Sequence, residues 1–550
     1  MTDRKNLADL VFSNTDVMDI AEIESKYKPR QLKEGQMVTR FAPSPTGFLH
    51  IGAIYTAMID YIVAKQSGGI SCLRVEDTDQ KRQVESATEV MMKGFADFGI
   101  KFDEGVDENY HSYGDYAPYI QSQRATIYKT YAKELLRQGK AYLCFCTEDD
   151  LEQMRNVQRL QKQRTGYYGN YAVCRNLTEE QVIEKLEQGL PFTIRIKSNG
   201  DYNKRIKFVD VIRGERYLPE NDCDPIIMKS GDDLPTYHFA HVVDDHLMGT
   251  THIIRGDEWI SSMPLHLEMF KIMGWEAPHY AHIAPMQKMD NGAKRKLSKR
   301  KDPEANVAHF FEEGYPIESV IDYLLNIINS NFEDWRKENP KEDYMKFPLD
   351  LNKTSASGAL FDLNKLNSIS KNIISEYTNL EVYDKALAWA KEYDADFCTL
   401  LTDNEEYIKK VFNIERSGDR KRKDFVKWSS LKDEVSYFFN DRFEKASLSD
   451  RGYDTETINA CLQGYANLIN ETDERSIWWK KVKELADENQ FVSNMKAYKK
   501  EPEKYKGSIA DFMKIVRLAI RGRENSPDLY EIMHVMGVEN TRERIIKSLI

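Results

Sequence analysis

The segment that most constrains the fold runs from residue 37 to residue 76, where a strand, a tight turn, a helix and a second strand follow one another. The string MVTRFA is typical of a buried strand, and apolar residues then recur at helical spacing from Ile54 to Ile62. The string SGG at 67–69 predicts the end of that helix, and ISCLRVE (70–76) predicts the second strand. Such a βαβ unit begins a parallel α/β sheet.

The sheet is expected to be interrupted and later resumed. A helix ending at Gly139 and the strands PFTIRIK and KRIKFVDVIRGE, separated by the turn signal Asn199-Gly200, predict an inserted α+β subdomain. Short apolar strands then follow at PIIMKS, YHFAHVVDD and THIIRGDE. We therefore expect the sheet that begins near residue 38 to be completed after the insertion.

The second half of the chain has helical patterns. An apolar face recurs from Ile509 to Ile520 behind a capping pattern at Ser508, and SPDLYEIMHVMG places Ser526 at an N-cap and Pro527 at the first helical position. The predicted fold class is α/β plus all-α, with a Rossmann-type parallel-sheet domain, an α+β insertion and helical bundles. The expected divisions are 1–36 (N-terminal extension), 37–114 and 226–305 (sheet domain), 115–225 (insertion), 306–380 and 381–550 (helical domains).

Composition narrows the class of protein. The 550 residues suggest roughly two to five domains, and 41% apolar with 30% charged residues is typical of a soluble enzyme. We expect no membrane span, because no apolar run is long enough, and no signal peptide. The seven cysteines are scattered, which favours a reducing cytoplasm. The net charge of −11 argues against a nonspecific nucleic-acid binder but allows a local basic face.

The turn APSPTGFLHIG, between the first strand and its helix, carries the first chemical motif. Such a turn brings a helix N-terminus to the carboxyl edge of the sheet, where unpaired N–H groups suit a phosphate. Gly47 and Gly52 let a ligand approach the backbone closely, and His50 can donate a hydrogen bond to a phosphate oxygen. The alternative is a Pro-rich loop with a capping histidine, but the full string favours a phosphate site.

The second motif is KLSKR, from Lys296 to Arg300, which follows the strand-like AHIAPM. A basic loop of this kind can clamp phosphates on which negative charge develops, because lysine acts as a mobile point charge. Alone, such a run usually forms a solvated surface. Together with the first motif, it indicates a second phosphate-binding element.

These two strings resemble the HIGH and KMSKS signatures of class I aminoacyl-tRNA synthetases. The first histidine and the glycine of HIGH are present as His50 and Gly52, and both lysines of KMSKS are present as well. Ala53 replaces the final histidine and Arg300 the final serine. Catalysis in this chain therefore cannot depend on a second histidine.

Within that class, the chain resembles the bacterial-type glutamyl-tRNA synthetases. RFAPSPTG, LRVEDTD, LPTYHFAHVVDDHLMG and IIRGDEW match that family's blocks in order, from about residue 38 to 380. The resemblance implies that L-glutamate is activated with ATP and Mg²⁺ and then transferred to the terminal adenosine of tRNA-Glu. It also implies that the insertion binds the acceptor end, that 306–380 contacts the stem and that 381–550 binds the anticodon. We expect a cytoplasmic monomer with no membrane partner.

A glutamate pocket needs cations for two carboxylates and an anion for the ammonium. Arg40 and Arg255 each stand at the end of a predicted strand and can fork onto a carboxylate, while Glu76 can hold the ammonium. Alternatively, Arg40 and Glu76 only pair with each other. The resemblance implies a glutamate-binding set of Arg40, Ala42, Ser44, Glu76, Tyr237 and Arg255, an ATP-binding set of Pro43, Thr46, Gly47, His50, Gly52 and Lys299, and a catalytic set of His50, Gly52, Lys296 and Lys299.

Two further clusters could bind a metal. Some members of this family hold a structural zinc in the insertion through Cys-x-Cys, a further cysteine and a tyrosine or histidine. Cys144, Cys146 and Cys174 fit three of these places, while Tyr168, Tyr171 or Asn176 stands near the fourth. Three buried thiols are the alternative, and we assign no metal. The set Asp244, Asp245, His246 and His252 favours a structural turn, because adjacent ligands rarely fit one ion.

The remaining basic run is a candidate contact to the tRNA backbone, and it comprises Arg420, Lys421, Arg422 and Lys423. Four rival functions are considered, and the sequence argues against the first three. A truncated relative that modifies a tRNA base would lack the helical half, and a glutaminyl enzyme would carry a different first motif. A catalytically inactive tRNA-binding protein would have lost its signature residues. An enzyme that also charges tRNA-Gln cannot be told apart at this level.

Overall fold

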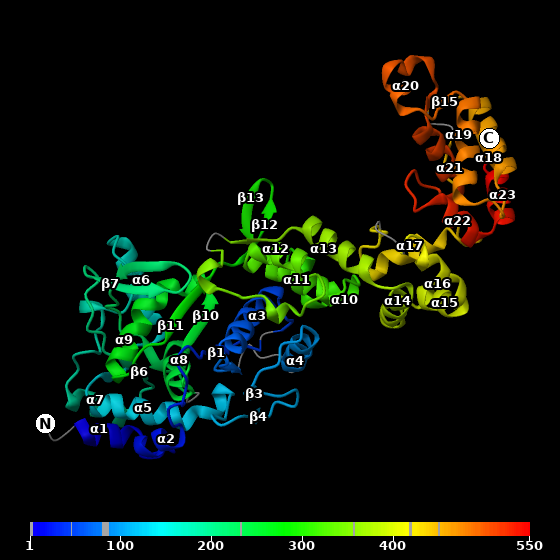
Figure 1. The fold of residues 1–550 in the computed structure, drawn as a ribbon. Coiled ribbons are helices and arrows are strands. Elements are labelled where there is room, and N and C mark those ends of the chain that lie inside the picture. Colours follow the sequence, from blue (N-terminus) through cyan, green and yellow to red (C-terminus); the bar gives the residue numbers. More distant parts are fainter. Residues whose placement is uncertain are drawn as a thin grey trace. The chain divides into compact units, whose positions relative to one another are not determined.

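The computed structural model describes residues 4–45, 47–79, 87–231, 234–355, 358–416, 421–448 and 452–550. These residues form two compact units. The first unit comprises 1–309 and 324–361, and the second comprises 310–323 and 362–550. Figure 1 shows that the first unit contains the main sheet and that the second is made mostly of helices.

The first unit is built on a six-stranded sheet in the order β2-β1-β10-β11-β7-β8. Its strands are β1 (Val38–Phe41), β2 (Ile70–Leu73), β7 (Arg205–Asp210), β8 (Gly214–Pro219), β10 (His252–Gly256) and β11 (His279–Ile283). All neighbours are parallel except the hairpin β7–β8. The helix α3 (Ile51–Gln66) joins the parallel pair β1 and β2, which confirms the predicted βαβ unit.

Three local predictions are wrong. The segment YHFAHVVDD forms the helix α8 (Tyr237–Leu247) instead of a strand, because a short apolar run that is buried on several sides shows no decisive period. Strand β7, which we placed in the insertion, completes the main sheet beside β11. Strand β9 (Ile226–Met228), which we placed in the main sheet, belongs to the insertion. Pairing between distant segments decided both strands, and no local pattern encodes it.

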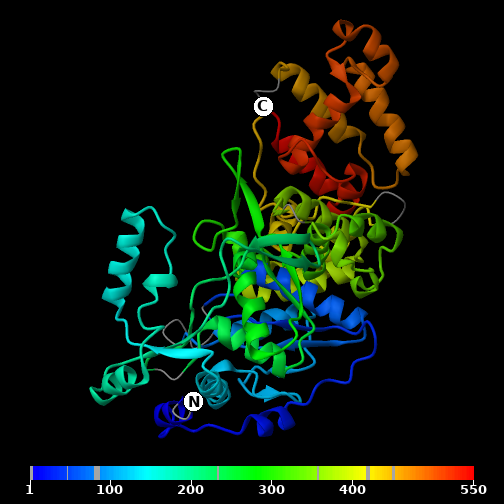
Figure 2. The ribbon, with the colours of Figure 1, turned by 90° about the vertical axis from the view of Figure 1, so that its left-hand side faces the viewer.

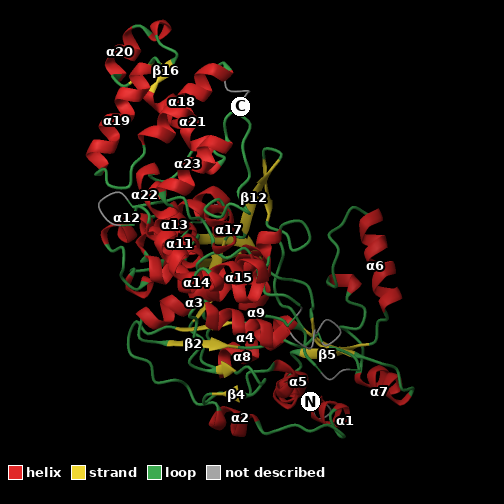
Figure 3. Cartoon of the chain, turned by 90° about the vertical axis from the view of Figure 1, so that its right-hand side faces the viewer, coloured by secondary structure: helices red, strands yellow, loops and turns green. Residues whose placement is uncertain are grey.

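The insertion has its own three-stranded sheet, in which β6 (Thr193–Ile196) pairs with β5 (Ala141–Cys144) and β9. Two capped helices belong to it, α6 (Glu148–Leu160) and α7 (Glu179–Glu187). Figures 2 and 3 both show α6 standing away from the main sheet.

The N-terminal segment folds along the same unit. Its helices α1 (Arg4–Val11) and α2 (Ile20–Lys26) run beside α5 (Ala125–Arg137), as Figure 1 shows. The backbone N–H of Met18 donates to Thr130 at 2.9 Å, and Tyr131 donates to Glu24 at 2.7 Å. Arg30 then forms an ion pair with Glu104 at 2.6 Å.

The other elements of the first unit are α4 (Ala87–Asp97), β3 (Gly105–Val106), β4 (Ser112–Tyr113), α9 (Met263–Met273), β12 (Met286–Asp290), β13 (Ala293–Lys296), α12 (Asn331–Glu338) and β14 (Ala359–Leu360). Two helices contain residues of both units, α10 (Val307–Glu312) and α11 (Ile317–Ile328). The second unit contains α13 (Leu363–Glu376), α14 (Asn379–Tyr393), α15 (Ala395–Asp403), α16 (Glu405–Asn413), α17 (Leu431–Ser436), α18 (Thr455–Leu468), α19 (Arg475–Glu488), β15 (Phe491–Val492), α20 (Met495–Lys500), β16 (Gly507–Ser508), α21 (Ile509–Arg521), α22 (Leu529–Met536) and α23 (Val538–Lys547).

The helical half is close to the prediction, with one corrected boundary. Ser508 caps α21, whose apolar face is buried as expected. Helix α22 is capped by Asp528 and not by Ser526, because the Asp528 carboxylate accepts the backbone N–H of Glu531. Among the described residues, no helix has the length and apolar character needed to cross a membrane.

Candidate active site

A cavity of about 390 Å³ opens at the carboxyl ends of strands β1 and β10. The position agrees with the rule that open parallel sheets bind ligands at this edge. All six residues of the predicted glutamate-binding set line the cavity, and they come from four separate segments of the chain: Arg40, Ala42, Ser44, Glu76, Tyr237 and Arg255.

Arg40 is held in this cavity by a carboxylate on α8. This residue is 4% exposed, and its Nε lies 3.3 Å from Oδ1 of Asp245. Asp245 also accepts from Arg74 at 2.7 Å. Burial opposes the charge of Asp245, but the two arginines outweigh it and hold the pKa of that carboxyl well below its usual range. The charged Asp245 therefore orients Arg40 toward the cavity.

Glu76 does not use Arg40 as its partner. Its Oε1 accepts from Arg74 at 3.0 Å, while no described ion pair joins Glu76 to Arg40. The alternative in which Arg40 and Glu76 only neutralise each other is therefore wrong. Burial raises the pKa of Glu76, and a cation bound beside it would favour its charged form.

Arg255 lies among neutral groups. Its Nε donates to Nε2 of His282 at 3.0 Å, and its other nitrogens face His266 and the carbonyl of Trp259. No described carboxylate lies within ion-pair distance of this guanidinium, although its residue is only 5% exposed. A buried cation without a counter-charge is costly, so the site is suited to an anionic ligand group.

A second cavity of about 350 Å³ contains the signature residues. It is lined by His50, Gly52, Lys296 and Lys299, and it shares Thr56 and Gly256 with the first cavity. The predicted catalytic set is therefore assembled at one place, beside the predicted amino-acid pocket.

His50 is the N-cap residue of α3. Its Nδ1 accepts the backbone N–H of Gly52 at 2.9 Å, so that in the neutral ring the hydrogen is on Nε2. Burial lowers the pKa of His50 to about 4, and the charge of Lys299 acts in the same direction. A neutral imidazole that caps the helix through one nitrogen carries its hydrogen on the other nitrogen. That side of the ring meets the backbone of Leu297 at the wall of the second cavity, where it can also donate to a ligand.

The loop that carries the two signature lysines is anchored by ion pairs. Arg295 binds Asp302 through two bonds of 2.6 and 2.7 Å, and the Ser298 N–H donates to the same carboxylate at 2.8 Å. Lys299 lies over the ring of Phe48, with its Nζ 4.7 Å from the ring centre. Its Nζ also donates to the Phe48 carbonyl at 3.4 Å, and the partial desolvation of this ammonium lowers the pKa of Lys299.

Two residues of the predicted ATP-binding set do not line the second cavity. Pro43 accepts the Glu76 N–H through its carbonyl at 2.9 Å, so its role is to join the turn to the end of β2. Gly47 has φ of +118°, a conformation that other residues rarely adopt. Thr46 lies outside the described residues.

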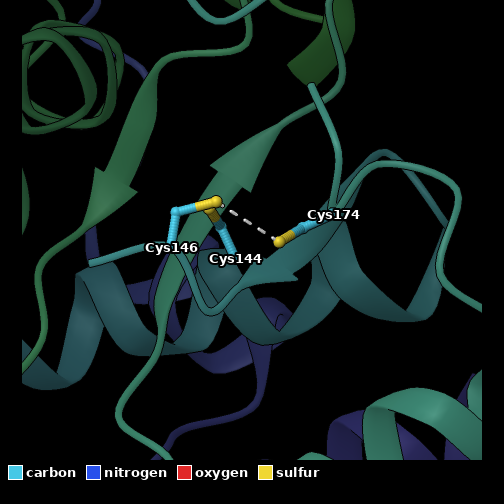
Figure 4. Close-up of side chains that lie close together, drawn as sticks. All are labelled: Cys144, Cys146 and Cys174. Carbon is cyan, nitrogen blue, oxygen red and sulfur yellow. Dashed lines mark hydrogen bonds between the residues drawn. The ribbon is translucent and has the colours of Figure 1, made fainter. Parts of the chain in front are cut away.

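The three insertion cysteines meet, as Figure 4 shows. Their sulfur atoms lie within 4.8 Å of one another, with the sulfurs of Cys146 and Cys174 3.6 Å apart. The hydroxyl of Tyr167 lies 3.4 Å from the sulfurs of Cys144 and Cys146. Three cysteine sulfurs that converge within this distance can act together as ligands of a metal cation.

The tyrosines that we expected near this cluster have other partners. The hydroxyl of Tyr168 donates to the Arg164 carbonyl, and that of Tyr171 lies within hydrogen-bond distance of two glutamine side chains, to one of which it donates. Tyr167 takes their place because its hydroxyl also accepts the Cys174 N–H at 3.1 Å. The acidic residues of α8 accept hydrogen bonds from buried arginines. For example, Nε of Arg124 lies 2.7 Å from Oδ1 of Asp244. This agrees with a structural role for that segment.

The basic run at 420–423 is only partly available to a ligand. Arg420 lies outside the described residues, and Arg422 is 5% exposed and pairs with Asp424 at 2.6 Å. Lys421 and Lys423 are less enclosed, and they contact Glu376 and Asn372, respectively.

Sequence reasoning missed one residue that lines the first cavity and one that packs against its Arg40. Trp259 lines it, and its ring lies 4.4 Å from that of Tyr237. His241 lies below, 3.4 Å from Nη2 of Arg40. The tryptophan belongs to the quoted block IIRGDEW, so its place in that block was an available signal. His241 belongs to the quoted block LPTYHFAHVVDDHLMG, so the same kind of signal was available for it.

Comparison with known proteins agrees with this geometry. Residues 36–368 match the family described as tRNA synthetases class I (E and Q), catalytic domain, and residues 381–549 match an anticodon binding domain. A glutamate–tRNA ligase of Clostridium perfringens strain 13 is 49% identical over 545 residues, covering 98% of this chain and all of its own length. One from Acetivibrio thermocellus is 44% identical over 548 residues, covering all of both chains.

A solved structure has the same fold. The crystal structure of a glutamate tRNA ligase from Elizabethkingia meningosepticum CCUG26117, in complex with its amino acid, superposes with a TM-score of 0.73 at 28% identity. The match covers 94% of this chain and 99% of that one. The similarity therefore extends through both the sheet domain and the helical half.

Proposed function

This chain belongs to the glutamate–tRNA ligase family of class I aminoacyl-tRNA synthetases, and we propose from its two adjoining cavities how it performs that reaction. It activates L-glutamate with ATP to glutamyl-adenylate, releasing pyrophosphate. It then transfers the glutamyl group to the 3'-terminal adenosine of tRNA-Glu.

The first cavity binds glutamate. Arg40 and Arg255 each take one carboxylate, while Glu76 holds the ammonium and Tyr237 with Ser44 adds hydroxyl contacts. The support for this assignment is that Arg255 is buried among neutral partners. Its positive charge is compensated only when an anionic group of the ligand is present.

The second cavity binds ATP, which arrives as its Mg²⁺ complex. The N-terminus of α3 faces the phosphates, and the Nε2–H of His50 donates to a phosphate oxygen. Lys296 and Lys299 neutralise the charge that develops there, since both line the same cavity and lie on a loop anchored through Arg295.

The chemical step joins the two cavities at Thr56 and Gly256. An oxygen of the glutamate α-carboxylate attacks the α-phosphorus of ATP, and a new P–O bond forms. The bond from that phosphorus to the pyrophosphate oxygen breaks, and pyrophosphate carries the charge away. The protein contributes position and electrostatic stabilisation, with no covalent enzyme intermediate.

The other parts of the chain bind tRNA. We assign the acceptor end to the insertion (115–225), the stem to residues 306–380 and the anticodon to residues 381–550. The anticodon assignment is supported by the matched anticodon binding domain. For backbone contact we retain Lys421 and Lys423, and we withdraw Arg422 because it is buried in an ion pair.

The cysteine group of the insertion fits a structural zinc. Zinc in structural sites takes four ligands, mostly thiolates and imidazoles. Cys144, Cys146 and Cys174 would supply three thiolates, and Tyr167 is the nearest oxygen for the fourth place. When bound, the ion would tie β5 to the segment that carries Cys174. We also propose a cytoplasmic location, because the seven cysteines are all free thiols. The monomeric state stays a prediction.

The decisive experiment is charging of purified tRNA-Glu and tRNA-Gln with labelled glutamate. We expect charging of tRNA-Glu, and charging of both tRNAs would make the enzyme nondiscriminating. Charging of neither would contradict the proposal and would favour an inactive tRNA-binding protein.

A further inference from the structure

Beyond the residues that line the amino-acid cavity, Arg255 depends on a buried histidine. The Nε of Arg255 donates to Nε2 of His282 at 3.0 Å. Because an arginine can only donate, this nitrogen of His282 must be the one without a hydrogen. The hydrogen of the neutral ring is therefore on Nδ1.

A carboxylate stands at that second nitrogen. Nδ1 of His282 lies 2.5 Å from Oδ2 of Asp210, and neither residue is more than 1% exposed. Asp210 also accepts the backbone N–H groups of Arg213 at 2.8 Å and of Ile212 at 3.0 Å. Burial opposes its charge, but the bond from His282 and these N–H groups lower the pKa of Asp210.

The three residues lie on three adjacent strands. Arg255 on β10 is in register with His282 on β11, and Tyr280 on β11 is in register with Asp210 on β7. The last of these strands comes from the segment between the two halves of the sheet domain. Asp210, which does not line the cavity, is therefore linked to Arg255 through the imidazole of His282.

We propose that Asp210 and His282 are positioning residues that hold Arg255 ready for a carboxylate of glutamate. The inference rests on the proposed function, since it concerns the same substrate pocket. Asp210 fixes the tautomer of His282, and the tautomer fixes the acceptor for Arg255. Because its partners His282 and His266 are neutral, the positive charge of Arg255 is left uncompensated and can attract a ligand carboxylate.

The substitution Asp210→Asn tests this arrangement with little change in volume. The new amide has one acceptor and one donor, so in either orientation one N–H faces another N–H, either at His282 or at the backbone of residues 212–213. If His282 adopts the other tautomer, its Nε2–H points at the Nε–H of Arg255. We expect the KM for glutamate in the charging assay to rise roughly 10- to 100-fold, with the KM values for ATP and tRNA within about twofold of wild type.

Asp210→Glu separates positioning from packing. Glutamate retains the carboxylate acceptor but adds a methylene, so the proposal predicts a smaller rise in glutamate KM than for Asp210→Asn. A packing role predicts the reverse, because asparagine preserves the volume. The matched control is His279→Ala, an exposed histidine on β11, the strand that carries His282, which should leave every KM unchanged.

Wild-type glutamate KM in Asp210→Asn, or a larger effect of Asp210→Glu, overturns the inference. If thermal unfolding shows that Asp210→Asn does not fold, His282→Gln and His282→Leu replace it. Glutamine can still accept from Arg255 and leucine cannot, so leucine should raise the glutamate KM at least tenfold more, and equal effects would refute the proposal. Failure of the wild-type enzyme to charge tRNA-Glu would instead refute the proposed function itself.

Discussion

The Nδ1 atom of His50 accepts a hydrogen bond from the backbone N–H of Gly52, 2.9 Å away, at the first turn of α3. This bond gives His50 two tasks. It caps the helix with one nitrogen and leaves the other nitrogen as a donor toward the second cavity.

The two tasks of His50 can be separated by substitution. His50→Asn keeps an oxygen that can cap α3 but lacks the reach of Nε2, so we expect near wild-type stability with kcat lower by roughly 10²–10³. His50→Ala should lose the same activity and also about 1 kcal/mol of stability through loss of the cap. Steady-state charging and thermal unfolding measure the two effects. Equal stability of both variants would argue against the capping bond.

Gly52 is required because of the imidazole beside it. A Cβ at position 52 would lie 2.9 Å from Nδ1 of His50 and would displace the ring. In an ordinary helix Gly→Ala stabilises by about 0.5–1 kcal/mol, so Gly52→Ala should lower kcat strongly without lowering the melting temperature. A variant with normal kcat would show that the position of the His50 ring is not critical.

Lys299 should act in the chemical step and not in tRNA binding. Lys299→Ala removes a mobile positive charge at the second cavity, so we expect kcat to fall roughly 10²-fold or more while tRNA affinity changes little. Single-turnover charging and a filter-binding assay measure the two quantities. Lys294→Ala, on the strand before the loop, is the control and should charge normally. Parallel losses of kcat and tRNA affinity would contradict the assigned role.

The pH dependence of kcat/KM for ATP should reflect the lowered pKa of His50 in the ligand-free enzyme. Since burial lowers this pKa to about 4, the ring stays neutral well below its usual range. The acidic limb attributable to His50 should therefore lie near pH 4, and it should be absent in His50→Asn. Because the unfolded state binds more protons between about pH 6.5 and pH 4, this group also lowers the free energy of unfolding as the pH falls through that range. If activity instead declines around pH 6.5 in the wild-type enzyme and this decline is absent in His50→Asn, the lowered pKa of His50 would be contradicted.

The convergence of Cys144, Cys146 and Cys174 predicts that the purified protein contains zinc. Purified protein should hold about one zinc per chain by elemental analysis, because three thiols and a tyrosine hydroxyl converge there. Cys146→Ser should lose the metal and destabilise the insertion. Cys223→Ser, a thiol of the same insertion outside the group, should retain it. Wild-type protein without zinc would leave these residues as a buried thiol cluster.

Local signals predicted the parts of the site that lie within one short segment. The turn from Arg40 to Gly52 predicted a strand end, a helix N-terminus and a phosphate-binding histidine, because glycine, proline and apolar spacing act over a few residues. The six glutamate-binding residues followed from matched blocks of the family, and all six line one cavity. Their individual environments did not follow from those blocks.

The tertiary structure alone decided which charges compensate one another. Arg40 pairs with Asp245, 205 residues away, and not with Glu76. Arg255 reaches Asp210 through His282 because β7 joins the main sheet instead of the insertion. Local propensity and spacing can specify a turn or a helix start. The register of distant strands and the burial of a guanidinium depend on the whole fold, since they arise only when segments far apart in the chain pack together.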